Sequence, residues 1–265
     1  MRVVNNLSRF CIAAAVVTSA LFAFPGIGAA TVYSLSGDYS DVSNPNGAWS
    51  FTQGATPLAH YAQPSDGNAL NPAATNGFYG AGPDFSIGPI ILKTTQDGSA
   101  TSPSSFPNYS DNDFLTGDVL VHGTNSGGGA DVFINWTAPT AGLINFTSSL
   151  WYAHGAVVRS QDITAFLGAA NLGTVTITNG VTRSTAITSL NGAGLSVSSG
   201  DVLAFRFVPT SGQPFGSLTG ISATVDFTAT SGAIPEPGTW ALMILGFGTA
   251  GGMLRRRRSE AALTA

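Results

Sequence analysis

The stretch DVFINWTAP (131–139) decides the fold class. Its apolar residues Val132, Ile134 and Trp136 recur at every second position, which is the period of a β-strand with one buried face. Pro139 lacks the backbone N–H that a sheet ladder needs, so the strand is expected to end before it. The stretch therefore predicts a strand in a sheet packed on one side.

The same alternation recurs through the middle of the chain, and no long apolar repeat of 3.6 residues interrupts it. In DVLAFRFVP (201–209) it predicts that Arg206 faces water. Asn179-Gly180 predicts a tight hairpin turn to a following strand, and residues 54–86 and 94–117 predict long loops. We therefore expect an all-β fold with two packed sheets. The other alternating stretches are GLINFTSSLWY (142–152), DITAFLG (162–168), LGTVTIT (172–178) and GISATVDFTAT (220–230).

Charge is scarce and negative in residues 31–234. This region holds twelve Asp, no Glu and four basic residues, a formal charge of −8. Nucleic-acid binding needs a basic footprint, so we expect no nucleic-acid partner. The basic residues are Lys93, Arg159, Arg183 and Arg206.

The N-terminus has the pattern of a secretory signal peptide. Arg2 and Arg9 precede an apolar run, and small residues then lead to a predicted cleavage between Ala30 and Thr31. The single cysteine, Cys11, lies within this segment. A mature chain without it contains no thiol, so its stability must come from core burial and strand pairing.

The C-terminus, PEPGTWALMILGFGTAGGMLRRRR (235–258), predicts a membrane anchor. As a helix, Trp240 to Leu254 would span about 22 Å, against about 30 Å of hydrocarbon, with flanking side chains covering the deficit. The four arginines behind it predict a cytoplasmic C-terminus and residues 31–234 outside. They are Arg255, Arg256, Arg257 and Arg258.

These residues resemble the PEP-CTERM sorting signal, in its PEPxxWA form, of exported Gram-negative proteins. The resemblance rests on Pro235-Glu236-Pro237, Trp240-Ala241 and the arginines. It implies export, transient anchoring in the inner membrane, and processing near the PEP motif by an exosortase-type transpeptidase. The product would lie at the cell surface or outside it, in a biofilm or exopolysaccharide setting.

The middle of the chain is similar to a β-sandwich module of PEP-CTERM and other extracellular bacterial proteins, itself reminiscent of carbohydrate-binding jelly rolls. We therefore expect a jelly-roll-like antiparallel β-sandwich over 31–234, between a signal peptide (1–30) and a sorting signal (235–265). The resemblance brings no catalytic residues. It rests on SGDYSDVSNPNGAWSF (36–51), GDVLVH (117–122), WTAPTAG (136–142), SVSSGDVLAF (196–205) and GISATVDF (220–227).

Two groups of residues are candidate sites in the loop-rich half. Tyr61 and Tyr79 are candidate stacking platforms for sugar rings, although an exposed tyrosine in a loop is common. Asp111, Asp113 and Asp118 supply the hard oxygen ligands that Ca²⁺ prefers, but they lack the spacing of an EF-hand loop. A solvated acidic turn is the alternative to a structural calcium site.

The sequence favours a non-catalytic protein. The carboxylates of the middle region are all Asp, with no motif to pair them for glycoside hydrolysis, and no nucleophile elbow is present. An exported structural or interaction protein of the extracellular matrix is the first hypothesis. A carbohydrate-binding module for exopolysaccharide and a secreted hydrolase are the alternatives.

Overall fold

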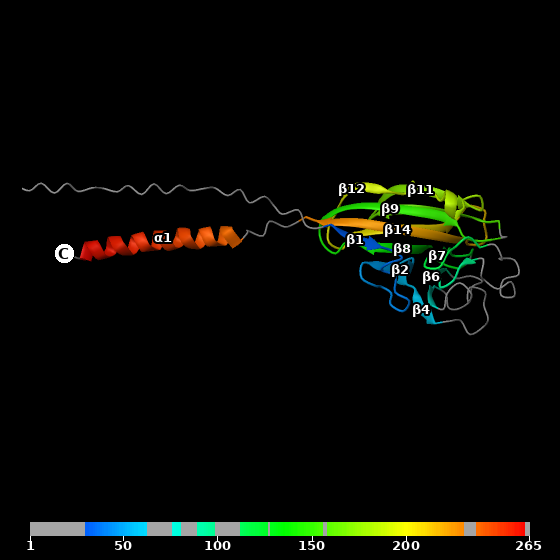
Figure 1. Cartoon of the computed structure of the whole chain (residues 1–265), viewed down its shortest axis with the longest axis horizontal. Helices are drawn as coiled ribbons and strands as arrows, with labels where there is room; N and C mark the ends of the chain where they lie inside the picture. Colours follow the sequence, from blue (N-terminus) through cyan, green and yellow to red (C-terminus); the bar gives the residue numbers. More distant parts are fainter. Residues whose placement is uncertain are drawn as a thin grey trace, which may run out of the picture. The chain divides into compact units, whose positions relative to one another are not determined.

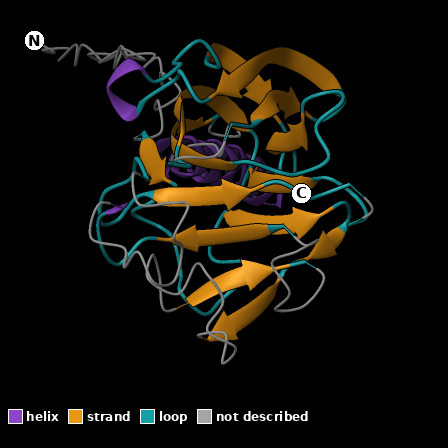
Figure 2. Cartoon of the chain, turned by 90° about the vertical axis from the view of Figure 1, so that its right-hand side faces the viewer, coloured by secondary structure: helices purple, strands orange, loops and turns teal. Residues whose placement is uncertain are grey.

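The computed structural model describes residues 30–62, 76–80, 89–98, 112–126, 128–155, 158–230 and 237–262. The chain divides into two compact units, one of residues 27–231 and one that joins residues 1–26 to residues 232–265. The first unit is built of strands, and the second contains the helix α1 (Figure 1, Figure 2). We describe each unit by itself.

The strand unit contains two antiparallel sheets, which confirms the predicted antiparallel β-sandwich. The eight-stranded sheet has the order β12-β9-β14-β7-β6-β5-β4, with β1 also paired to β14. Its strands are β1 (Thr31–Ser34), β4 (Ala59–Ala62), β5 (Asn76–Tyr79), β6 (Ile90–Lys93), β7 (Val119–His122), β9 (Gly142–Tyr152), β12 (Gly192–Val197) and β14 (Leu218–Ala229).

The six-stranded sheet has the order β11-β10-β13-β8-β2-β3. Its strands are β2 (Trp49–Gln53), β3 (Thr56–Pro57), β8 (Val132–Thr137), β10 (Ser160–Leu167), β11 (Ala170–Thr178) and β13 (Val202–Pro209).

The longest ladder joins β9 to β14. Every residue of β9 from Gly142 to Tyr152 has a partner on β14, from Ala229 back to Thr219. On the other side of β14, its first residues pair with β7 and Thr224–Phe227 pair with β1. The N-terminal and C-terminal strands of the sandwich are therefore neighbours in one sheet.

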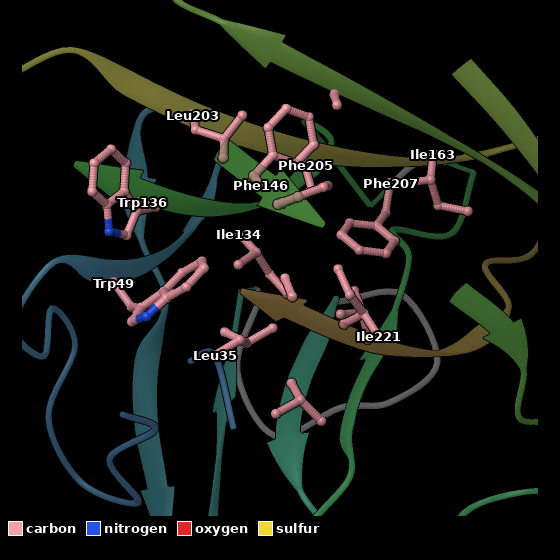
Figure 3. Packing of buried hydrophobic residues seen from close by; sticks show 14 of the residues in the cluster. Leu35, Trp49, Ile134, Trp136, Phe146, Ile163, Leu203, Phe205, Phe207 and Ile221 are labelled. Atoms are coloured by element: carbon pink, nitrogen blue, oxygen red, sulfur yellow. The ribbon is translucent and has the colours of Figure 1, made fainter. Parts of the chain in front are cut away.

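The alternation seen in the sequence determines which side chains enter the core. In β8, Val132, Ile134 and Trp136 are fully buried, and the residues between them remain partly exposed. Side chains of both sheets meet in this core, where Trp49 lies opposite Trp136 across the β2–β8 pair (Figure 3). Full burial of one such apolar side chain contributes about 1.5–3 kcal/mol. Arg206 was predicted to face water, and its side chain is 39% exposed, in agreement with that prediction.

The turn before β2 is held by one amide side chain. Asn44 Nδ2 donates to the carbonyls of Phe51 (2.7 Å) and Leu58 (2.9 Å), and Asn44 Oδ1 accepts from the N–H of Phe51 (2.8 Å). The carbonyl of Phe51 also accepts from the N–H of Leu58 (3.0 Å), so the Asn44 side chain reinforces a backbone contact between these two residues. This interaction ties the segment before Trp49 to β2 and to Leu58, the residue between β3 and β4.

The predicted hairpin after β11 is wrong. Asn179-Gly180 does form a turn, in which the N–H of Val181 donates to the carbonyl of Thr178. The chain then enters a short 3₁₀ helix, Arg183–Thr185, instead of a strand of the same sheet. It continues along the other sheet, where Ile187 bridges to Leu150 of β9.

The C-terminal unit contains α1 (Pro237–Ala262), which begins at a proline, as helices often do. It is longer than the predicted apolar segment, because it continues through Arg255–Arg258. Among the described residues, no helix is both long enough and apolar enough to cross a membrane. Glycines at 246, 248, 251 and 252 dilute the apolar run. The structure thus confirms a helix but does not support the predicted transmembrane segment or its anchoring in the inner membrane.

Two buried histidines lie at one end of the sandwich. The His122 and His154 rings are 5.8 Å apart, and the residues are only 8% and 9% exposed. The N–H of Leu218 donates to Nδ1 of His154, and Nδ1 of His122 has no hydrogen-bond partner in the described part of the chain. Burial, reinforced by the charge of Arg159, lowers the pKa of His122 to about 4. The pKa of His154 is also lowered, first by burial and then by the positive charges of His122 and Arg159.

We predict that acid destabilises the sandwich through His122. The folded pKa lies below the ordinary value, so the unfolded chain takes up the proton first as the pH falls. The stabilisation is complete above about pH 6.5 and declines towards pH 4, by on the order of 3 kcal/mol for this group. Urea unfolding of the wild type and of His122→Gln, at about pH 7 and about pH 4.5, should show a smaller loss in the variant. His60→Gln, at an exposed position of β4, is the control, and an equal loss in all three proteins would contradict the prediction.

Candidate functional site

A second, smaller hydrophobic cluster covers the outer face of the eight-stranded sheet. It joins residues of β5, β6, β7, β9 and β14 to Phe114, and Val181 and Ala186 pack against it. The loop before β7, which carries Phe114, and the segment after β11, which carries Val181 and Ala186, therefore meet over this outer face. The buried members are Tyr79, Ile90, Leu92, Phe114, Leu120, Trp151, Ala153 and Leu218.

Arg183 lies where these two loops meet. Its Nε and Nη2 donate to the two carboxylate oxygens of Asp118, each at 3.0 Å, and its backbone N–H donates to Oδ2 of Asp113 at 2.6 Å. The hydrogen bond to Asp118 is the largest cause that raises the pKa of Arg183. This two-pronged geometry is the strong form of an arginine–carboxylate pair.

The loop that carries Asp118 is fixed by its own hydrogen bonds. Asp118 Oδ2 also accepts from the N–H of Leu115 (2.8 Å). One oxygen of Asp97 accepts from both the N–H and the hydroxyl of Thr116, which lowers the pKa of Asp97. The Asp118 side chain is only 13% exposed, so its position is set before any ligand arrives.

Trp151 forms the floor beneath the guanidinium of Arg183. The guanidinium lies 5.5 Å from the centre of a Trp151 ring, and Trp151 Nε1 donates to the carbonyl of Asp113 (2.7 Å). The ring lies directly over Gly220 of β14, where an added Cβ would overlap it. Trp151 is only 2% exposed. Its ring therefore orders the site and is not available to stack on a ligand.

A polar cavity of about 370 Å³ lies beside this arginine–carboxylate pair. Ser149 and Ser222, which face each other across the β9–β14 ladder, line it together with Asp118 and Arg183. The other lining residues are Ser36, Gly117, Val119, Trp151 and Ile221.

The cavity offers both donors and acceptors. Arginine has five N–H donors, of which Asp118 engages two. The serine hydroxyls can donate or accept, and Asp118 balances the charge of Arg183. Such a set suits a neutral ligand with several hydroxyl groups better than a phosphate.

The structure describes two of the three predicted calcium ligands. Asp111 lies outside the described residues. Asp113 and Asp118 do come together, but around Arg183. Within the described part of the chain, no group of three His, Cys, Asp or Glu side chains is placed to hold a metal ion.

The predicted tyrosine platforms separate into one buried and one partly exposed residue. Tyr79 is 4% exposed and belongs to the second cluster, so it offers no ring face for stacking. Tyr61 is half-buried and meets the edge of Tyr79, with ring centres 5.2 Å apart. Tyr61 alone keeps the exposure that a platform needs.

Sequence reasoning missed Arg183, the residue that organises this site. One signal could have pointed to it. Arg183 is the only charged residue between Asp162 and Asp201, and an isolated charge in a neutral stretch of a β-protein requires a partner or solvent. The partners are far away in sequence, at positions 113 and 118.

The predicted processing residues lie at the ends of the described units. Thr31 begins β1, while residues 1–29 lie outside the described residues and Ala30 is just within them. Pro235 and Glu236 also lie outside, and Pro237, Trp240 and Ala241 belong to α1.

Comparisons with known proteins found solved structures of low similarity to this chain. No curated protein sequence matches the chain significantly. The C-terminal CBM6 of LamC, a marine laminarinase from Zobellia galactanivorans, aligns at 13% identity and a TM-score of 0.25, over 41% of this chain and 79% of that one. The isomalto-dextranase of Arthrobacter globiformis T6, complexed with panose, aligns at 14% identity and a TM-score of 0.31. That alignment covers 64% of this chain but only 24% of the dextranase.

The C-terminal segment matches a family model. The match spans residues 233–258 and is to the PEP-CTERM protein-sorting motif, which includes the proline pair, Trp240 and the four arginines. The chain therefore carries a PEP-CTERM protein-sorting motif at its C-terminus.

Proposed function

We propose that the chain is an exported structural or interaction protein of the cell surface or extracellular matrix. In this proposal an exosortase-type transpeptidase recognises residues 235–241 and cuts close to them. The motif match over residues 233–258 is the observation that carries the proposal. The signal-peptide pattern before Thr31 and the thiol-free sandwich are consistent with it.

We assign the sandwich a non-catalytic role. Asp118, the best ordered carboxylate of the candidate site, is paired with Arg183 and bonded to the N–H of Leu115. A carboxylate whose two oxygens are already held by three hydrogen bonds is poorly placed to reach a reacting group. Turnover of an exopolysaccharide that is abolished by a single Asp→Asn change would overturn this assignment.

A second candidate function is binding of a neutral sugar of an exopolysaccharide. The cavity beside Asp118 and Arg183 favours it, because a sugar presents adjacent hydroxyl groups to a matching set of fixed donors and acceptors. The site is ordered in advance by Trp151 and Asp97, which reduces the entropy cost of binding. Matrix attachment through a sugar is compatible with the first proposal.

The sorting proposal predicts a truncated product in the native host. Protein released from the cells should lack residues 240–265, and the double change Pro235→Ala and Pro237→Ala should leave them attached and reduce release. Intact-mass spectrometry of the released and cell-bound fractions measures both. Ser231→Ala, just before the matched segment, is the control and should be processed normally. Finding residues 240–265 on the released wild type would contradict the proposal.

The sugar-binding proposal predicts binding that depends on Arg183. Arg183→Met should weaken binding to a responsive glycan by about tenfold or more, since it removes charge-assisted hydrogen bonds worth about 1.5–3 kcal/mol. A glycan array followed by calorimetry measures this. Arg206→Met is the matched control, because Arg206 also faces an aspartate, Asp131 at 3.7 Å, but on the other sheet.

Two outcomes would contradict the proposal that the cavity beside Arg183 binds a sugar. The first is glycan binding that survives Arg183→Met while the variant remains folded by circular dichroism. The second is binding that is lost in Tyr61→Ala and retained in Arg183→Met, which would move the site to the tyrosine.

A further inference from the structure

Strand β11 is an edge strand that lacks the usual protection. In the described part of the chain it pairs with β10 alone and ends the six-stranded sheet. Its nine residues, ANLGTVTIT, contain no charge and no proline. Natural proteins generally protect an edge with charges, especially lysine, with proline, or with a covering segment. An uncharged run rich in Thr, Val and Ile is typical of strands that add to another strand.

The free backbone groups of this edge belong to Thr174 and Thr176. The N–H of Thr210 donates to the carbonyl of Ser160, so Ser160 directs its backbone groups towards β13. The backbone N–H and C=O groups of successive residues point to opposite sides of a strand. Those of Gln161, the next residue of β10, therefore point towards β11, where its partner is Ile177. The same alternation turns the backbone groups of Thr174 and Thr176 away from β10, to the open side.

The one irregularity in β11 leaves this segment intact. The register shifts where Ala165 faces Gly173 and Phe166 faces Asn171, before the segment 173–178. From Gly173 onward the pairing with β10 is continuous. Hydroxyl contacts also fix the exposed face, since Thr174 bonds to Thr164 (2.9 Å) and Thr176 donates to Asp162 (2.6 Å). The edge is therefore straight and ordered along its outer part.

The border that carries β11 has few charges: β11 itself has none, and the Asp162 carboxylate on β10 accepts from the hydroxyl of Thr176. The eight-stranded sheet ends at β12 on the border where the six-stranded sheet ends at β11, and β11 lies against β9 (Figure 1). Between Asp162 and Asp201 the only charge is Arg183. Residues 31–234 as a whole have a formal charge of −8, so two copies repel each other at most other surfaces. This border of low charge is where a second copy meets the least repulsion.

We infer that β11 pairs with β11 of a second copy, antiparallel and about a two-fold axis at Val175, to join two six-stranded sheets into one. In this register Thr174 of each copy faces Thr176 of the other, and each such pair exchanges two backbone hydrogen bonds. Val175 of one copy lies opposite Val175 of the other, and both side chains lie on the face that packs on the core. The sequence is thus complementary to itself, as a two-fold interface requires. This self-pairing is independent of how the C-terminus is sorted.

Sedimentation of the full chain over a wide range of concentration tests the inference. Wild type should show a monomer–dimer equilibrium, and Thr176→Lys should raise its dissociation constant by about tenfold or more, because two ammonium groups then lie on diagonal neighbours. Thr147→Lys is the matched control and should dimerise like wild type. Thr147 is equally exposed on a strand, but β9 has a partner on each side. Thermal melting establishes that both variants are folded.

Amide hydrogen exchange supplies a second readout that needs no variant. The amides of Thr174 and Thr176 should exchange rapidly in dilute protein and slowly in concentrated protein. The amides of Val175 and Ile177 bond to β10, so they should be protected in both. A wild type that stays monomeric, or equal association of all three proteins, would overturn the inference, as would exchange at Thr174 and Thr176 that does not depend on concentration. A monomer would leave the sorting proposal unaffected.

Discussion

The pairing of β9 with β14 is the constraint on which the rest of the sandwich depends. These two strands are in register over eleven residues, and every other strand of their sheet attaches directly or through neighbours to one of them. Their inner side chains, including Phe146 and Val225, contribute to the main core. Their outer side chains include Trp151, Ser149 and Ser222, which form the floor of the candidate site. One ladder therefore supports both the stability of the fold and the geometry of its polar cavity.

The candidate site illustrates how a β-sandwich can order polar groups through an arginine–carboxylate pair. Two loops distant in sequence are held together because Arg183 satisfies Asp118 with its side chain and Asp113 with its backbone. The pair is only partly buried, so its contribution to stability is modest. Its larger effect is to fix donors and acceptors at one position beside the cavity, over a rigid aromatic floor.

The sequence was sufficient where the physics is local or periodic. Alternation placed Ile134 and Phe205 in the core, and the C-terminal motif was readable because its parts are consecutive. The sequence was insufficient where segments that are distant along the chain meet in the fold. Asn179-Gly180 makes the expected turn, but whether the chain then returns to the same sheet depends on the bridge of Ile187 to Leu150. The surroundings of Asp118 and Tyr79 could not be predicted for the same reason, because their partners come from other strands and loops.

The position of β1 has a consequence for the topology of the folded unit. Thr31 faces Phe227 within one sheet, so the first and last strands of the sandwich run side by side. A short linker could join the two ends, and the chain could then be opened at an exposed turn such as the one at Gly200. The sandwich is thus a natural candidate for circular permutation, and a chain opened at Gly200 would keep both the Arg183 loop and the β9–β14 ladder intact.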